Sequence, residues 1–264
     1  MSERLDAALV SRGLARSRAT ASAVIKAGAV TIDGKVAMKP SQIVTDSSRL
    51  IVTAPRGDSA PPLRDPQNDG WGMASRAGGK LEAAITELRS QNFTVNVAGK
   101  NCLDIGASTG GFTGVLLQNG AAKVIALDVG HGQLREELRT NPKVTVMERV
   151  NARYLTAEQL PYPPQFITCD VSFISLTMMF EPIRAVAEPG AQVLLLIKPQ
   201  FEVGKGNLGK GGIVRDEKLI ANAIETVKKE AANFGILVAK VIPSAVPGTN
   251  GNQEYFLFGA VELQ

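Results

Sequence analysis

Two hydrophobic periodicities alternate along most of the chain. After residue 79, stretches with apolar residues every three or four positions, typical of amphipathic helices, are interleaved with short continuous apolar runs, typical of buried strands. The expected helices span 80–91, 111–119, 132–139, 174–187 and 216–234. The expected strands span 101–105, 122–128, 143–148, 165–170, 191–197, 236–242 and 254–261.

The order of these segments predicts the fold class. Alternating helices and strands form a mostly parallel α/β sheet with helices on both faces, and ligands bind at the carboxyl ends of its strands. The last two strands have no helix between them, which predicts that the last strand is antiparallel to the rest of the sheet.

The first 56 residues follow a different pattern. Residues 4–14 and 17–26 have the spacing of two short amphipathic helices. Residues 29–37 alternate in strand fashion around an Asp-Gly pair, a strong hairpin signal, and residues 50–53 supply another strand. These elements predict a small α+β domain over residues 1–56.

A change of composition separates the two patterns. Residues 54–79 contain four prolines and five glycines with little apolar content, which is typical of a linker. We therefore expect an N-terminal domain at 1–56, a linker at 57–79 and an α/β domain at 80–264.

Charge is unevenly divided between these parts. Nine lysines and arginines against four acids give residues 1–56 a net charge of +5, whereas the whole chain has a formal net charge of +4, so the remainder carries −1. A basic domain beside a near-neutral one suggests that the first holds a polyanion while the second carries the chemistry. For a charge excess alone, a solvated charged surface is the simpler explanation.

Composition excludes several classes of protein. Hydrophobic residues make up 44% and charged residues 20%, as in ordinary globular proteins. The longest apolar stretch, Val193 to Ile197, is far shorter than the roughly 20 residues of a membrane span, and no leader opens the chain, so we expect a cytoplasmic protein. Cys102 and Cys169 lie in strand-like runs without the close spacing of a zinc or redox pair, and we expect no metal.

A small-residue turn is the first candidate for chemistry. Strand 101–105 runs into the sequence GASTGG and then into a helix, where backbone amides can approach a ligand closely. The turn does not match the dinucleotide pattern G-x-G-x-x-G. Acidic residues near two strand ends suit a cationic ligand with a ribose diol, such as S-adenosylmethionine, better than a phosphate. The candidate cofactor contacts are Asp104, Gly106, Ser108, Gly110, Gly111 and Asp128.

Two other motifs are incomplete matches to catalytic signatures. The same turn matches the nucleophile elbow G-x-S-x-G, but a hydrolase needs a histidine late in the chain, and the sole histidine is His131. The loop 204–211 nearly matches a Walker loop, but Gly211 replaces the hydroxyl residue that would bind magnesium.

The N-terminal sequence resembles a known RNA-binding module. The order RLDAALVSRGLARSRATASAVIKAGAVTIDGKV is similar to the module first seen in ribosomal small-subunit protein four. In that module a basic helix pair and a hairpin contact RNA phosphates. The resemblance implies RNA contacts at Arg4, Arg16, Arg18 and Lys26.

The remaining motifs resemble the TlyA (hemolysin A) family over nearly the whole chain. They are, in order, SRAGGKL, CLDIGASTGGFT, ALDVGHGQL, CDVSFIS, LIKPQFEVGKGNLGKGGIVRD and GNQEYFL. The family consists of ribosomal RNA 2′-O-methyltransferases related to FtsJ-type enzymes, which implies a Rossmann-like methyltransferase sheet and S-adenosylmethionine as cofactor. It also implies a Lys-Asp-Lys-Glu tetrad, which matches Lys80, Asp170, Lys198 and Glu254.

Elementary acid–base chemistry agrees with such a tetrad. A ribose 2′-hydroxyl is a poor nucleophile until a base removes its proton, and a lysine can serve only when its pKa is lowered from about 10.4. We expect Lys198 to be the base, Lys80 to lower its pKa by like-charge repulsion, and Asp170 and Glu254 to orient the reacting groups. The alternative for any one residue is a surface charge or ion pair. Glu202 and Glu262 are expected to be ordinary charges.

Two other functions remain open on the sequence. A ribosome-assembly protein that binds RNA without catalysis needs the basic domain but no tetrad. A membrane-lytic hemolysin, which the family name suggests, needs a spanning or pore-forming segment, and none is recognisable. The favoured partners are ribosomal RNA or ribosomal subunits rather than DNA or membranes, and a monomer is expected.

Overall fold

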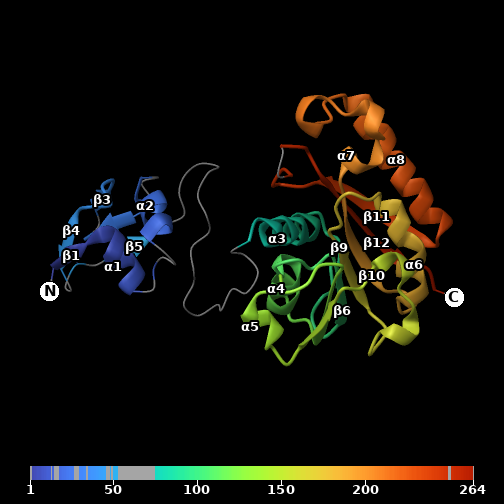
Figure 1. Ribbon diagram of the computed structural model, residues 1–264, viewed down its shortest axis with the longest axis horizontal. Helices are drawn as coiled ribbons and strands as arrows, with labels where there is room; N and C mark the ends of the chain where they lie inside the picture. The colour runs from blue at the N-terminus through green and yellow to red at the C-terminus, as the bar shows by residue number, and fades with distance from the viewer. Residues whose placement is uncertain are drawn as a thin grey trace. The chain divides into compact units, whose positions relative to one another are not determined.

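The computed structural model describes residues 2–12, 14, 18–26, 30–33, 35–45, 48, 50–52, 75–248 and 251–263. The chain divides into two compact units, Met1–Gly70 and Trp71–Gln264 (Figure 1). Of the expected linker 57–79, residues 57–74, with Trp71, lie outside the described residues, as do Arg16 and Gly34, whereas residues 76–79 are helical and do not belong to a linker. Each unit is described by itself.

The first unit contains two short helices and short antiparallel strands. The helices are α1 (Leu5–Ser11) and α2 (Arg18–Lys26), and the strands are β1 (Ser2–Arg4), β2 (Val30–Ile32), β3 (Lys35–Ala37), β4 (Ile43–Thr45) and β5 (Leu50–Val52). Strand β2 lies between β3 and β5, and β1 pairs with β4. Fully buried Leu5, Leu9, Ile25 and Val30 join the helices to the strands, so the unit has its own small core.

The described part of the second unit contains a seven-stranded sheet. Its strands are β6 (Asn101–Ile105), β7 (Lys123–Asp128), β8 (Val144–Glu148), β9 (Phe166–Cys169), β10 (Gln192–Ile197), β11 (Ile236–Pro243) and β12 (Tyr255–Val261). The strand order is β11-β12-β10-β9-β6-β7-β8. All neighbours from β10 to β8 are parallel, whereas β12 is antiparallel to both β10 and β11. The predicted mostly parallel sheet with an antiparallel last strand is confirmed.

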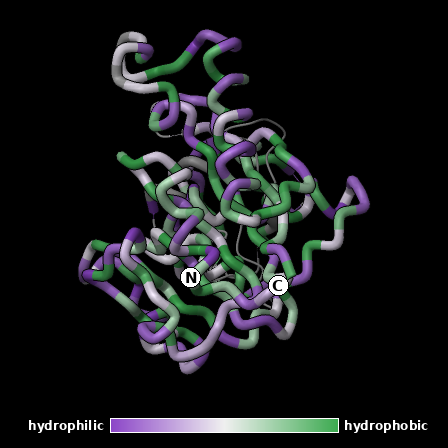
Figure 2. Tube along the Cα trace, turned by 90° about the vertical axis from the view of Figure 1, so that its right-hand side faces the viewer, coloured by the Kyte–Doolittle hydropathy of each residue, from purple (hydrophilic) through white to green (hydrophobic). Residues whose placement is uncertain are grey.

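Helices cover both faces of this sheet (Figure 1). They are α3 (Arg76–Ser90), α4 (Gly111–Gln118), α5 (Glu136–Arg139), α6 (Phe180–Val186), α7 (Pro199–Glu202) and α8 (Glu217–Asn233), with 3-10 turns η1 (Ala152–Tyr154), η2 (Ala157–Gln159), η3 (Leu176–Met179), η4 (Lys205–Asn207) and η5 (Lys210–Gly212). Helices α3 and α4 share one apolar cluster with the sheet, and α6 and α8 share the other. Figure 2 shows the hydrophobic stretches in the interior and hydrophilic turns at the periphery.

Three helix boundaries differ from the sequence expectation, two of them for a local reason. Helix α3 begins at Arg76 rather than at 80, because the side chain of Ser75 accepts a hydrogen bond from the Gly78 amide and caps the first turn. The expected helix 132–139 is reduced to α5, since Gly132 has a positive φ of 68°. The expected helix 174–187 is divided into η3 and α6.

Candidate active site

The carboxyl ends of the parallel strands open into a cavity of about 1050 Å³. Side chains from four parts of the fold reach it: helix α3, the turn after β6, the loop after β9, and the segment after β10. Glu254, just before β12, completes the wall. This position is the one expected for a ligand site in an open α/β sheet.

Lys80 and Glu254 form the first ion pair of the cavity. Lys80 Nζ donates to Glu254 Oε2 at 2.6 Å, although the two residues are 174 positions apart. Lys80 is 7% exposed and Glu254 is 2% exposed. Gln200 Nε2 donates to the other carboxylate oxygen at 3.3 Å. A buried carboxylate needs such partners, because an unpaired buried charge is strongly destabilising.

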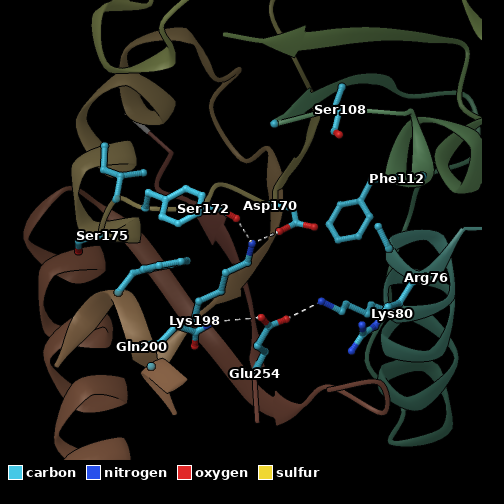
Figure 3. A pocket seen from close by; sticks show the side chains of 18 of the residues that line it. Arg76, Lys80, Ser108, Phe112, Asp170, Ser172, Ser175, Lys198, Gln200 and Glu254 are labelled. Atoms are coloured by element: carbon cyan, nitrogen blue, oxygen red, sulfur yellow. Dashed lines mark hydrogen bonds and ion pairs between the residues drawn. The ribbon is translucent and has the colours of Figure 1, made fainter. Parts of the chain in front are cut away.

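Lys198 and Asp170 form the second ion pair. Lys198 Nζ lies 2.5 Å from Asp170 Oδ1 and donates to Ser172 Oγ at 2.8 Å. Figure 3 shows Lys198 directed toward Asp170 and Ser172, and Lys80 directed toward Glu254. The four residues of the expected tetrad therefore line one cavity. Each lysine is paired with its own carboxylate, an arrangement that the sequence analysis did not anticipate.

The turn after β6 lines the cavity opposite these pairs. Gly106, Ser108 and Gly111 are lining residues, and Gly106 and Ser108 have φ of 81° and 48°. A Cβ at Gly106 would lie 2.6 Å from the main-chain oxygen of Asp170. Glycine is therefore required where the end of β6 approaches the residue that follows β9. Gly110, with φ of 90°, begins α4 and faces Leu138 rather than the cavity.

Asp128, at the end of β7, braces this turn. Its carboxylate accepts hydrogen bonds from the Ser108 amide at 2.8 Å and from the Gly130 amide at 2.7 Å. Asp128 is half-buried and lies beside the turn, outside the residues that line the cavity. The structure thus brings Asp128 and Ser108 together from elements 20 residues apart.

Asp104 occupies a different place from the one expected of a cofactor contact. It is fully buried, and its carboxylate accepts hydrogen bonds from Thr113 Oγ1 at 2.6 Å and from Thr168 Oγ1 at 3.0 Å. Burial raises the pKa of Asp104 to about 6, and the two hydroxyl donors counteract part of that effect. The residue lies behind the cavity and connects α4 to β9.

The loop after β9 adds aromatic and polar groups that the sequence analysis did not single out. Phe173 is 92% exposed and has φ of 66°, a conformation that bulky residues rarely adopt. Its ring lies 5.3 Å from that of Phe201 between centroids. Both rings line the cavity, as do Ser172 and Gln200. The sequence feature that could have identified these four residues is their position in the motifs that contain Asp170 and Lys198.

In the first unit, two of the candidate RNA contacts, Arg4 and Arg18, are paired with one acid. Arg4 donates twice to Asp6 at 3.0 Å, and Arg18 Nη2 lies 3.5 Å from the same carboxylate. Hydrogen bonding from Arg4 lowers the pKa of Asp6. Arg4, Arg18 and Lys26 are exposed. Arg16, the fourth candidate, lies outside the described residues.

The described residues contain neither a cluster of metal ligands nor a membrane-spanning helix. Among the described residues, no group of three or more His, Cys, Asp or Glu side chains is arranged to hold a metal ion. Within the same part of the chain, each helix is too short or too polar to cross a membrane.

Comparison with protein-family models gives a match for each unit. Residues 73–260 match the model described as FtsJ-like methyltransferase. Residues 3–50 match the model described as S4 domain. The first match spans well over half of the chain.

Individual relatives agree with these matches. The chain is 45% identical to the 16S/23S rRNA (cytidine-2′-O)-methyltransferase TlyA of Mycobacterium tuberculosis, over 97% of this chain and 88% of that protein. It is 38% identical to Hemolysin A of Brachyspira hyodysenteriae, over 96% and 97% of the two chains. A solved structure described as a hemolysin from Streptococcus thermophilus is 35% identical, covers 99% of this chain and 89% of its own, and gives a TM-score of 0.68.

Proposed function

We propose that this chain, which belongs to the TlyA (hemolysin A) family of FtsJ-like methyltransferases, transfers the methyl group of S-adenosylmethionine to a ribose 2′-hydroxyl of ribosomal RNA. The observation that carries the proposal is the cavity in which two lysine–carboxylate pairs, each with a buried lysine, face the turn after β6. The relative from M. tuberculosis supports a cytidine ribose as the target. Ribosomal RNA as substrate implies that the protein acts in the cytoplasm.

The turn after β6 fits S-adenosylmethionine in its chemistry. Gly106 leaves the backbone open to a ligand at the strand end, and the Asp128 carboxylate is suited to accept hydrogen bonds from a ribose diol. When bound, the cofactor supplies an electrophilic methyl group on its sulfonium. The residues that would hold it are Gly106, Ser108, Gly111 and Asp128, while Asp104 and Gly110 support them from behind.

Lys198 is the proposed base. A neutral lysine amine has two N–H donors and one lone pair. Asp170 and Ser172 are placed to accept those two donors, so the lone pair is left to receive the proton of the 2′-hydroxyl. The resulting ammonium is stabilised by Asp170 until the proton leaves.

Lys80 and Glu254 are proposed to hold the target ribose. The pair is nearly buried, and Gln200 fixes the second carboxylate oxygen, so both side chains are ordered before substrate binds. Holding the hydroxyl near the donor methyl group supplies much of the rate in such a transfer, because it removes the entropy cost of bringing the reactants together.

Phe173 and Phe201 are proposed to receive the target base. An exposed ring at the mouth of the cavity offers an apolar face on which an unstacked base can lie. The S4 unit, with exposed Arg18 and Lys26, would supply most of the phosphate contacts.

One experiment tests the proposal directly. Purified protein is incubated with ribosomal subunits that lack the modification and with S-adenosylmethionine carrying a labelled methyl group. We expect label on one or a few cytidines, as 2′-O-methylcytidine after digestion and mass spectrometry, and an initial rate of labelling lower by about 10²-fold or more with Lys198→Ala. Tight RNA binding without methyl transfer by the wild type would favour the non-catalytic RNA binder instead, and label on a base atom would exclude ribose methylation.

A further inference from the structure

Glu202, which the sequence suggested to be an ordinary charge, makes specific contacts beside the cavity. It is the last residue of α7 and lies four residues after Lys198. Its half-buried carboxylate accepts a hydrogen bond from Ser175 Oγ at 2.6 Å and another from the Leu176 amide at 2.8 Å. Both donors belong to the start of η3, so Glu202 joins α7 to the loop that follows β9.

Residues 171–175, here called the arch, are therefore fixed at both ends by one short segment. At the first end, Lys198 contacts Asp170 and Ser172. At the second end, Glu202 contacts Ser175 and Leu176. Figure 3 shows Ser172 and Ser175 on the same side of the cavity as Lys198.

The middle of the arch carries Phe173 in a conformation that needs support. Its φ of 66° is unfavourable for an aromatic residue, and such a conformation persists only where the surrounding structure fixes it. The ring is almost fully exposed, and its described ring contact is with Phe201, which directly precedes Glu202. The conformation of Phe173 thus depends on the arch being held at both ends.

We propose that Glu202 is a positioning residue that holds the arch and so places Phe173 to receive the target base. The inference rests on the proposed RNA methylation and adds to it a residue that does not itself touch the reacting atoms. Without the carboxylate, the part of the arch after Ser172 can leave its strained conformation, while the contacts of Lys198 with Asp170 and Ser172 still hold the first end. Recognition of RNA should then weaken more than the chemical step.

Steady-state kinetics of the full-length protein tests this inference. We expect Glu202→Ala to raise KM for ribosomal RNA by about tenfold, with kcat changed by less than about threefold and with unchanged affinity for S-adenosylmethionine. Glu202→Gln keeps the shape and one acceptor oxygen, so its KM should lie between those of the wild type and the alanine variant. Glu181→Ala is the matched control, since it removes an exposed negative charge at the start of α6.

A double-mutant cycle separates positioning from general destabilisation. If Glu202 acts through the arch, Phe173→Ala should raise KM in the wild type but change it little in the Glu202→Ala background. Hydrogen exchange of the amides from Ser172 to Leu176 should accelerate in Glu202→Ala and not in Glu181→Ala. Additive effects on KM, or unaltered exchange in the arch, would overturn the role of Glu202. A wild-type protein that bound the cofactor but methylated no RNA would instead refute the proposed function.

Discussion

At the scale of single residues, the site depends on two lysines that are each paired with a carboxylate. The motifs predict Lys80, Asp170, Lys198 and Glu254 as the tetrad, and the structure places all four in one cavity. The sequence could not show how they pair, because each contact joins residues that are far apart in the chain. We expected like-charge repulsion between the lysines, whereas each lysine has its own carboxylate partner.

Substitution of Lys198 tests whether its lone pair matters. Lys198→Ala should lower the single-turnover rate of methyl transfer by about 10²-fold or more, with cofactor affinity nearly unchanged. Lys198→Arg should be almost as defective, because a guanidinium stays protonated and cannot accept the proton. Rapid-quench measurements at saturating cofactor give these rates. If the arginine variant transferred methyl groups at nearly the wild-type rate, Lys198 would be a positioning charge rather than the base.

Asp104 gives a prediction about the pH dependence of stability. Its pKa in the folded protein is about 6, above the ordinary value of 3.8, so the folded state binds the proton more tightly than the unfolded state does. The contribution of this residue to the free energy of unfolding should therefore fall as pH rises from about 4 to 6, by up to about 3 kcal/mol.

Comparison of the wild type with Asp104→Asn separates the pH-dependent contribution of Asp104 from those of the other carboxylates. The stability of the asparagine variant relative to the wild type should improve as pH rises through that window. Denaturant unfolding followed by far-UV circular dichroism at several pH values measures the difference. A constant difference between pH 4 and 7 would contradict a raised pKa at Asp104.

At the scale of elements, sequence periodicity located the strands of the sheet to within one or two residues at most ends. The elements that it missed are short and depend on distant partners: β1 and β4 pair with each other, and α7 has four residues. Helix α3 begins four residues before the predicted start, because the Ser75 side chain caps it. The sequence favoured a later start because Gly78 and Gly79 are unfavourable in a helix. Contacts of Glu202 with the arch span 26 and 27 residues and leave no local pattern.

The junction between β6 and α4 gives a prediction with a matched control. Gly106 and Gly99 both have positive φ, of 81° and 72°, but only a Cβ at Gly106 would meet main-chain atoms, whereas nothing lies within 4 Å of a Cβ at Gly99. Gly99→Ala should therefore cost only the backbone strain, about 1 kcal/mol. Gly106→Ala should cost several kcal/mol and also weaken cofactor binding, because the end of β6 must move away from Asp170.

Thermal unfolding and calorimetric titration with S-adenosylmethionine measure these two effects. The essential comparison is between the two alanine variants, since it cancels the strain that they share. Equal losses of stability, with the cofactor affinity of Gly106→Ala unchanged, would show that close approach at this junction is not required.

At the scale of the whole molecule, we propose that the two units divide recognition and chemistry. The sequence predicts this division from charge, since residues 1–56 carry a net charge of +5. The family models match an S4 domain and an FtsJ-like methyltransferase to the corresponding parts of the chain. The structure adds that the basic side chains of the first unit are not equivalent. Arg18 shares Asp6 with Arg4, whereas Lys26 is exposed at the end of α2.

Replacement of Arg18 and Lys26 by alanine in the full-length chain tests whether these residues contact RNA phosphates. Each phosphate contact releases counterions, so loss of both side chains should lower RNA affinity and reduce the slope of log affinity against log salt by up to about two units. Arg18→Ala alone should change the slope less than Lys26→Ala, because the Asp6 carboxylate already neutralises part of its charge. Lys228→Ala, which removes a partly exposed charge on α8, is the control.

Filter-binding titrations between low and physiological salt give the slopes. If the double variant and the control kept the wild-type slope, the phosphate contacts would have to come from other basic residues, and α2 would serve only to pack the core of the first unit.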